Sequence, residues 1–161
     1  MKFFQSGTSE LKFFADRMLG KLARKLRILG FDTLYFKDAD ENTVLRKSTG
    51  RILLTRDRSL YLKAKKLGYE VVFLRSDSWR SQLKMLANIY PIVSLARPFT
   101  RCSICNSPLR TARKEEVKGK VPEYIYKTVE EFKICEGCGK IYWRGTHVDL
   151  ILEELEKTVG L

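Results

Sequence analysis

Four cysteines stand in two pairs of identical spacing, Cys102-Ser-Ile-Cys105 and Cys135-Glu-Gly-Cys138. Two such pairs supply the four thiolates of a tetrahedral zinc site, which leaves no coordination position open for a substrate. A structural zinc ion is therefore expected, with iron as the alternative because a rubredoxin-like site uses the same ligands. A segment of about 60 residues has a marginal core, so the metal would contribute directly to its folding.

A second group of chemically capable side chains consists of aspartates that directly follow predicted strands. The carboxyl ends of parallel strands share one edge of a sheet, so these acids should converge there. Clustered carboxylates repel one another, and a hard cation such as Mg²⁺ offsets the repulsion and activates water for phosphodiester hydrolysis. The alternative is that they are ordinary turn and helix-capping residues. The group comprises Asp16, Asp38 or Asp40, Asp57 and Asp77.

The charge distribution favours nucleic acid as the partner. The formal net charge is +12, and residues 1–98 carry 20 Lys and Arg against 9 Asp and Glu, whereas residues 99–161 carry 11 against 10. A charged surface of the thermophilic type is the alternative, but it usually combines Lys with Glu, which is scarce in the first part. The basic residues expected to bind nucleic-acid phosphates are Arg17, Lys21, Arg24, Arg27, Arg56 and Arg58.

The elements that must position the acids alternate along the first part of the chain. Apolar runs predict strands at 12–16, 32–36, 51–57 and 70–74, and helical periodicity predicts helices at 17–29, 41–49, 58–67 and 78–88. Strands separated by single helices are typical of a parallel sheet covered on both faces. The α/β domain is therefore expected to span residues 1–98.

The second part should form a smaller unit. Residues 90–98 are expected to be a fifth strand or an exit segment, and Pro98 marks the predicted domain boundary. Residues 99–161 then contain the metal module, with strands expected within 123–133 and an amphipathic helix at 148–159.

Several function classes find no support. The sequence contains no Gly-rich phosphate loop of the Walker type and no dinucleotide fingerprint, and its single histidine, His147, lies outside the first part. No apolar run approaches the roughly 18 residues of a membrane span, and the first residues lack the apolar core of a secretory signal. A cytoplasmic protein that does not associate with a membrane is expected.

Three segments resemble motifs of the Mut-seven C-terminal RNase family, a PIN-like group. Residues 15–32 (ADRMLGKLARKLRILGFD) resemble its opening motif, and residues 52–57 (ILLTRD) its second motif. The cysteine pairs, with residues 138–147 (CGKIYWRGTH), resemble its appended zinc ribbon. The resemblance covers residues 12 to about 150.

This resemblance implies a PIN-like three-layer α/β/α fold with a parallel sheet, plus a small C-terminal Cys₄ zinc ribbon. It also implies a ribonuclease that uses clustered acids with Mg²⁺ or Mn²⁺. By motif position, Asp16 and Asp57 match the first and last family acids, and Asp40 matches an intermediate one. Asp38 and Asp77 remain possible additional acids.

The sequence thus predicts a metal-dependent ribonuclease in which Asp16, Asp40 and Asp57 hold the catalytic metal. The expected substrate is RNA, and DNA stays open because no residue pattern selects a 2′-hydroxyl. One alternative is a non-catalytic RNA- or ribosome-binding zinc-ribbon protein, which would bind in a salt-dependent way without turnover. Another is an adaptor whose ribbon contacts a protein partner.

Overall fold

The computed structural model describes residues 10–159, apart from the side chains of residues 146–148 and 151. Four parallel strands form its main sheet in the order β2-β1-β3-β4. They are β1 (Lys12–Ala15), β2 (Asp32–Tyr35), β3 (Ile52–Thr55) and β4 (Val71–Phe73). The central strand β1 pairs with β2 on one side and with β3 on the other. The predicted parallel sheet is confirmed.

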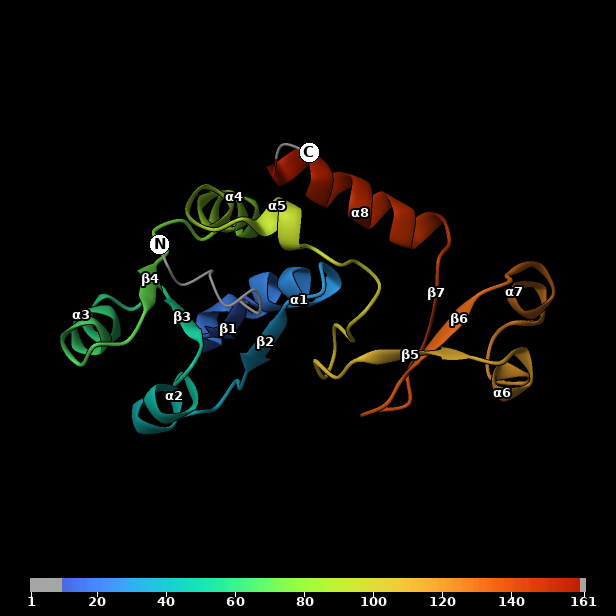
Figure 1. Cartoon of the computed structure of the whole chain (residues 1–161), viewed down its shortest axis with the longest axis horizontal. Coiled ribbons are helices and arrows are strands. Elements are labelled where there is room, and N and C mark those ends of the chain that lie inside the picture. Colours follow the sequence, from blue (N-terminus) through green and yellow to red (C-terminus); the bar gives the residue numbers. More distant parts are fainter. Residues whose placement is uncertain (1–9, 160–161) are drawn as a thin grey trace.

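Helices cover both faces of this sheet, which gives three layers (Figure 1). One face carries α1 (Gly20–Ile28), α4 (Trp79–Ile89), α5 (Ile92–Leu95) and α8 (Thr146–Val159), and the other carries α2 (Glu41–Lys47) and α3 (Arg58–Lys66). Neighbouring strand residues point to opposite faces: Phe13 belongs to the first apolar core and Phe14 to the second. The apolar strand runs therefore indicate a sheet buried on both sides.

Local signals set the ends of the elements. Asp57 and Ser78 cap α3 and α4, since their side chains accept the backbone N–H of Leu60 and Ser81. Gly30 ends α1 with a φ of 94°, and a Cβ at this position would lie 2.2 Å from the carbonyl oxygen of Arg97. A glycine is needed there because the chain that leaves α5 crosses directly over the end of α1.

Two parts of the α/β layers differ from the sequence prediction. The helix expected over 17–29 begins with a separate 3₁₀ turn, η2 (Arg17–Leu19), and α1 follows it. Residues 90–98 contain the short helix α5 instead of a strand. Pro91 has no N–H to give to a sheet ladder, but its carbonyl accepts the N–H of Leu95 in this helical turn.

A second sheet of three antiparallel strands follows Pro98, in the order β5-β6-β7. We call residues 99–145 the ribbon; its strands are β5 (Leu109–Ala112), β6 (Phe132–Cys135) and β7 (Ile141–Trp143). Two short helices, α6 (Lys114–Val117) and α7 (Glu123–Thr128), connect β5 to β6. Residues 123–128 were expected as strand, but Pro122 precedes them, and proline favours the start of a helix.

The last helix does not stay with the ribbon. Figure 1 shows α8 running from the end of β7 back to α4 and α5. Helix α8 contacts α4, and Leu155 is buried in the same core as Phe13. We propose that Pro98 divides the chain as the sequence suggested, into residues 1–98 and 99–161, with α8 reaching from the second part to complete the helix layer of the first.

Candidate functional site

The carboxyl ends of the two central strands hold a buried acid. Asp16 directly follows β1, and only 6% of its surface is exposed. Its Oδ1 accepts the backbone N–H of Arg17 at 2.8 Å, and its Oδ2 accepts the hydroxyl of Thr55 at 2.7 Å. Thr55 is the last residue of β3, the strand next to β1. The Asp16 carboxylate is therefore fixed across the strand pair.

The same threonine connects the acid to the chain that leads to Asp57. The buried Thr55 hydroxyl donates to Asp16 and accepts the backbone N–H of Asp57 at 2.9 Å. Asp57 is exposed, and its Oδ1 accepts the N–H of Leu60 at 3.2 Å at the start of α3. Sequence reasoning missed Thr55, although its position at the end of an apolar strand and two residues before Asp57 was visible.

The Asp16 carboxylate has donors but no cation as a partner. Within the described part of the chain, no ion pair includes Asp16 or Asp57. A buried carboxylate held only by neutral donors is costly, and it retains acceptor positions beyond the two that Arg17 and Thr55 occupy. These donors and this burial fit a hard divalent cation bound through carboxylate oxygens.

The remaining predicted acids lie farther out. Asp40 is exposed and caps α2 by accepting the N–H of Thr43 at 2.8 Å, and this hydrogen bond holds the pKa of its carboxyl below the usual value. Asp38 and Asp77 are also exposed. Among the described residues, only the four cysteines form a group of three or more ligands close enough to share one ion. The structure therefore connects Asp16 through Thr55 to the backbone of Asp57, and it brings no three of the predicted acids together as a ligand group within the described residues.

Most of the predicted phosphate-binding residues lie at the surface. Arg17, Lys21, Arg24 and Arg58 are exposed. Arg56 is half-buried and donates through Nη2 to the carbonyl oxygen of Arg75 at 3.0 Å. This contact ties the end of β3 to the chain that leaves β4.

Arg27 differs from the prediction, because its side chain is only 6% exposed. Its guanidinium donates to the carbonyl oxygens of Thr33, Ser103 and Ile104 at 2.9, 3.2 and 3.0 Å. Arg27 follows the buried Ala23 by four residues and so lies on the inner face of α1. It therefore attaches the ribbon to α1 and has no free face for phosphate.

The four cysteine sulfurs lie within 4.8 Å of one another. The Sγ atoms of Cys102 and Cys138 are 3.8 Å apart, and those of Cys105 and Cys135 are 3.3 Å apart. Ligands about 2.3 Å from a tetrahedral zinc ion stand about 3.8 Å from one another, so the sulfur set fits zinc.

Neighbouring groups favour the thiolate form of Cys135 and Cys105, whereas at Cys138 the hydrogen bond from the Lys140 backbone is outweighed by burial and by the other three cysteines, which raise the pKa of its thiol to about 11. The backbone N–H groups of Gly137 and Cys138 point at the Cys135 sulfur at 3.2 and 3.3 Å. Hydrogen bonding to Ser107 lowers the pKa of the Cys105 thiol to about 6. Metal binding requires deprotonated cysteines, and these donors favour that form.

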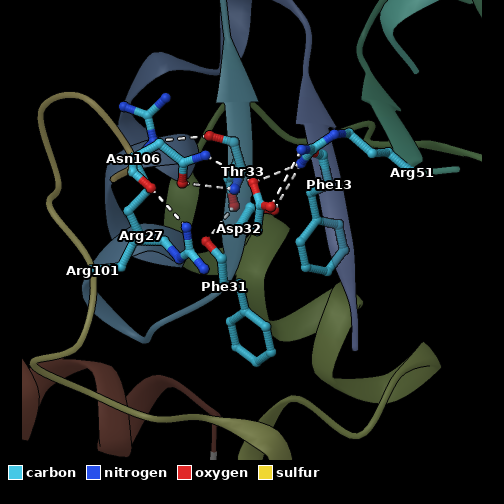
Figure 2. A network of polar contacts seen from close by, with 8 residues as sticks. All are labelled: Phe13, Arg27, Phe31, Asp32, Thr33, Arg51, Arg101 and Asn106. Atoms are coloured by element: carbon cyan, nitrogen blue, oxygen red, sulfur yellow. Dashed lines mark hydrogen bonds and ion pairs between the residues drawn. The ribbon is translucent and has the colours of Figure 1, made fainter. Parts of the chain in front are cut away.

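A polar network joins the cysteine module to the main sheet (Figure 2). Asn106, the residue after Cys105, accepts the N–H of Thr33 through Oδ1 at 2.9 Å and donates through Nδ2 to Asp32 at 2.8 Å. Its φ of 73° places it in the left-handed region that asparagine tolerates. Arg51 completes the network with an ion pair to Asp32 at 2.8 Å. The first cysteine turn is thus docked on the start of β2.

This network should make stability depend on pH. Burial raises the pKa of Asp32, but hydrogen bonds from Arg51 and Asn106 outweigh it, and the pKa lies below 3.8. Its stabilising contribution is complete above the unfolded value of about 3.9 and is lost as pH falls through the lower folded pKa.

The expected result is that Asp32→Asn is destabilised at neutral pH and that its deficit shrinks as the pH falls below about 4. Urea unfolding at several pH values measures this, with Asp38→Asn as the exposed control. Parallel pH profiles for the unaltered protein and Asp32→Asn would contradict the assignment.

Comparisons with known proteins agree with these features. The family model described as Mut7-C RNAse domain matches residues 11–155. No curated protein and no solved structure matches the chain. None of the helices within the described range has the length and apolar composition needed to cross a bilayer. The side chain of His147 lies outside the described residues.

Proposed function

The chain belongs to the Mut7-C RNAse domain family, and from this premise we propose that it hydrolyses RNA phosphodiester bonds with the help of a divalent cation. The family supports an RNA substrate, and the carboxyl edge of the main sheet supplies the acids. The observation that carries the proposal is the buried Asp16 carboxylate, held by Arg17 and Thr55 without a cationic side chain in the described residues.

We assign the cation to Asp16 and Asp57, with Asp40 as an outer acid. When bound, Mg²⁺ or Mn²⁺ supplies Lewis-acid stabilisation of the phosphoryl oxygens and a more acidic water. Thr55 orients the Asp16 oxygens because its hydroxyl is fixed by the N–H of Asp57. The exposed side chains of Arg17 and Lys21 stand on the segment that starts directly after Asp16, where they can hold the phosphates of the strand.

We further propose that the four cysteines hold a structural zinc ion. Their sulfurs have tetrahedral spacing, and four thiolates leave no open position for substrate. The ion would hold the two cysteine turns of the ribbon together, and the contacts of Arg27 and Asn106 would transmit that order to α1 and β2. Its role is therefore architectural.

The proposal predicts that cleavage requires an added divalent cation. End-labelled single-stranded RNA of mixed sequence is incubated with the purified protein and Mg²⁺, Mn²⁺ or no added cation. Cuts are expected with either ion and none without it, because Asp16 and Asp57 present only oxygen ligands. A DNA strand of the same sequence serves as the substrate control.

Two outcomes would contradict this proposal. Equal cleavage with and without cation would point to a contaminant or to metal-independent chemistry. Binding of RNA that weakens with salt, with no cleavage under any condition, would instead identify an RNA-binding protein.

A further inference from the structure

A cavity of about 650 Å³ lies where the ribbon meets the end of α1 and Leu152 of α8. Its lining is mainly apolar and includes the rings of Phe99, Tyr124, Tyr142 and Trp143. The size lies within the range of roughly 300–1,000 Å³ that is typical of ligand sites. The acid edge of the sheet does not contribute to this cavity, so it needs an explanation of its own.

The fold holds two of these rings in place. The Tyr142 hydroxyl lies 2.9 Å from the Cys102 sulfur, and the Trp143 ring packs edge-on against the buried Phe132 at a centroid distance of 6.1 Å. Tyr124, on α7, is different because it is 68% exposed. The cavity thus combines a fixed aromatic wall with an aromatic ring at its solvent side, an arrangement that suits stacking of a flat ligand.

Cationic groups surround this wall. The ammonium of Lys140 lies 5.6 Å from the Tyr142 ring, and that of Lys133 lies 4.8 Å from the Phe99 ring. Arg101 also lines the cavity, and its guanidinium is fixed because Nη1 donates to the carbonyl oxygen of Asn106 at 2.7 Å. A ligand that suits these rings and cations has a planar ring and a negative charge, which is the chemistry of a nucleotide.

The backbone at Phe99 adds a further observation. Its φ is 67°, a left-handed conformation that is uncommon for a residue with an aromatic side chain. Such strained residues concentrate at ligand-binding and active sites, where the surrounding structure enforces them. Here Phe99 is held by its neighbours, since its carbonyl oxygen accepts a hydrogen bond from Lys133 at 2.8 Å.

A basic helix face connects the acid edge to this cavity. Lys21, Arg24 and Ile28 lie at positions i, i+3 and i+7 of α1, and so share one face. The two basic residues are exposed, and Ile28 lines the cavity. From Gly20 to Ile28, α1 rises about 12 Å at 1.5 Å per helical residue, and the η2 turn separates its start from Asp16. A strand held at the acid edge can follow this face toward the ribbon.

We propose that the cavity is a nucleobase subsite, which accepts one unstacked base of a single-stranded RNA whose backbone follows the basic face of α1. The identity of the ligand rests on the ribonuclease function proposed above. The subsite lies several nucleotides from the scissile phosphate, and it makes the ribbon a part of substrate binding. Tyr124 closes over the base at the solvent side and stacks on it.

The test measures binding separately from cleavage. Single-stranded RNAs carrying 2-aminopurine at one position each are titrated with Asp16→Asn protein, so that the RNA stays intact. One position is expected to change its fluorescence on binding, because that base stacks in the cavity. Tyr124→Ala in the same background should weaken binding about 5- to 50-fold, the effect of losing one base–aromatic stack. Tyr124→Phe should bind like the parent, because it keeps the ring.

A second measurement identifies the base. An RNA that is abasic at the responsive position should bind the Asp16→Asn parent about as weakly as intact RNA binds the Tyr124→Ala variant. With this abasic RNA, Tyr124→Ala should cause no further loss of affinity. Lys118→Gln, an exposed ribbon lysine outside the cavity, is the control and should reduce affinity slightly for all RNAs. Zinc content and circular dichroism establish that each variant is folded.

Unchanged affinity of Tyr124→Ala, or additive losses from Tyr124→Ala and the abasic site, would overturn the subsite. The failure of the ribonuclease proposal looks different. In that case the unaltered protein fails to cut RNA with Mg²⁺ or Mn²⁺, whereas the 2-aminopurine response and the effect of Tyr124→Ala remain measurable.

Discussion

Replacing Asp16 with asparagine should reduce RNA cleavage by about 10³-fold or more while leaving the fold intact. The carboxylate would hold the cation, and a bound cation supplies several kcal/mol of transition-state stabilisation, with each 1.4 kcal/mol worth a factor of ten. Asparagine keeps an oxygen for the Arg17 N–H and similar volume at this buried position. Removing a buried charge without a cationic partner also relieves a folding cost.

The matched variants are Asp57→Asn and Asp38→Asn. Asparagine caps helices as well as aspartate does, so Asp57→Asn keeps α3 but loses a ligand oxygen, and it should also lose cleavage. Asp38→Asn alters an exposed acid outside the Asp16–Thr55–Asp57 chain of hydrogen bonds and should cleave normally.

A thermal shift provides a readout that is independent of activity. Mn²⁺ should raise the melting temperature of the unaltered protein and of Asp38→Asn, but not that of Asp16→Asn, because ligand binding to the native state stabilises it. Cleavage by Asp16→Asn at a rate similar to that of the unaltered protein would remove this acid from the active site.

Removing the metal from the cysteine centre should unfold the ribbon and also loosen the edge of the main sheet. The ribbon core is small, with Ala112, Val117 and Phe132 as its buried residues, so we expect its fold to depend on the proposed zinc ion. Structural zinc sites contribute roughly 10–16 kcal/mol of apparent binding free energy near pH 7. Once the first cysteine turn is lost, Thr33 loses the acceptor of its N–H, and Arg27 loses two carbonyl partners.

Hydrogen exchange measured by mass spectrometry, with colorimetric detection of released zinc, tests this expectation. Peptides from the ribbon and from residues 27–35 should lose protection together in Cys135→Ser or after chelation. Asn106→Gly is the matched control, because glycine adopts the same left-handed backbone but lacks the contacts to Thr33 and Asp32. It should expose residues 31–35 and retain its zinc. Full protection of residues 27–35 in the metal-free protein would show that the two parts are independent.

The sequence identified the elements whose signals are local. Apolar runs ending in an acid placed β1 and β3, because strands buried on both faces leave no polar alternation. The spacing of the cysteines indicated the sulfur cluster, because two pairs on tight turns supply the four ligands of a tetrahedral site. The short helices α5 and α7 were not predicted, because their β-branched and aromatic residues suggested strands. Each helix directly follows a proline, and proline favours the start of a helix.

Long-range contacts could not be predicted from local pattern. Arg27 looked like one of several surface cations, and only the position of the ribbon shows that its guanidinium reaches Ser103 and Ile104. Thr55 is an ordinary strand residue until β1 lies beside β3, where its hydroxyl meets Asp16. The apolar stripe of α8 predicted a buried face, but the packing of that face against α4 depends on the path of the whole chain.

Because α8 packs against the main helix layer, folding of this layer can be completed only after α8 has been synthesised. Leu155 enters the core that contains Phe13, so the side of α4 that α8 covers stays open until the entire ribbon has left the ribosome. Synthesis proceeds from the amino terminus, and partly built cores expose apolar surface that promotes aggregation. The cysteine turns are complete before α8 emerges, so metal capture can precede the closure of the last layer. Loading of the proposed zinc site can therefore order the ribbon before α8 covers the exposed side of α4.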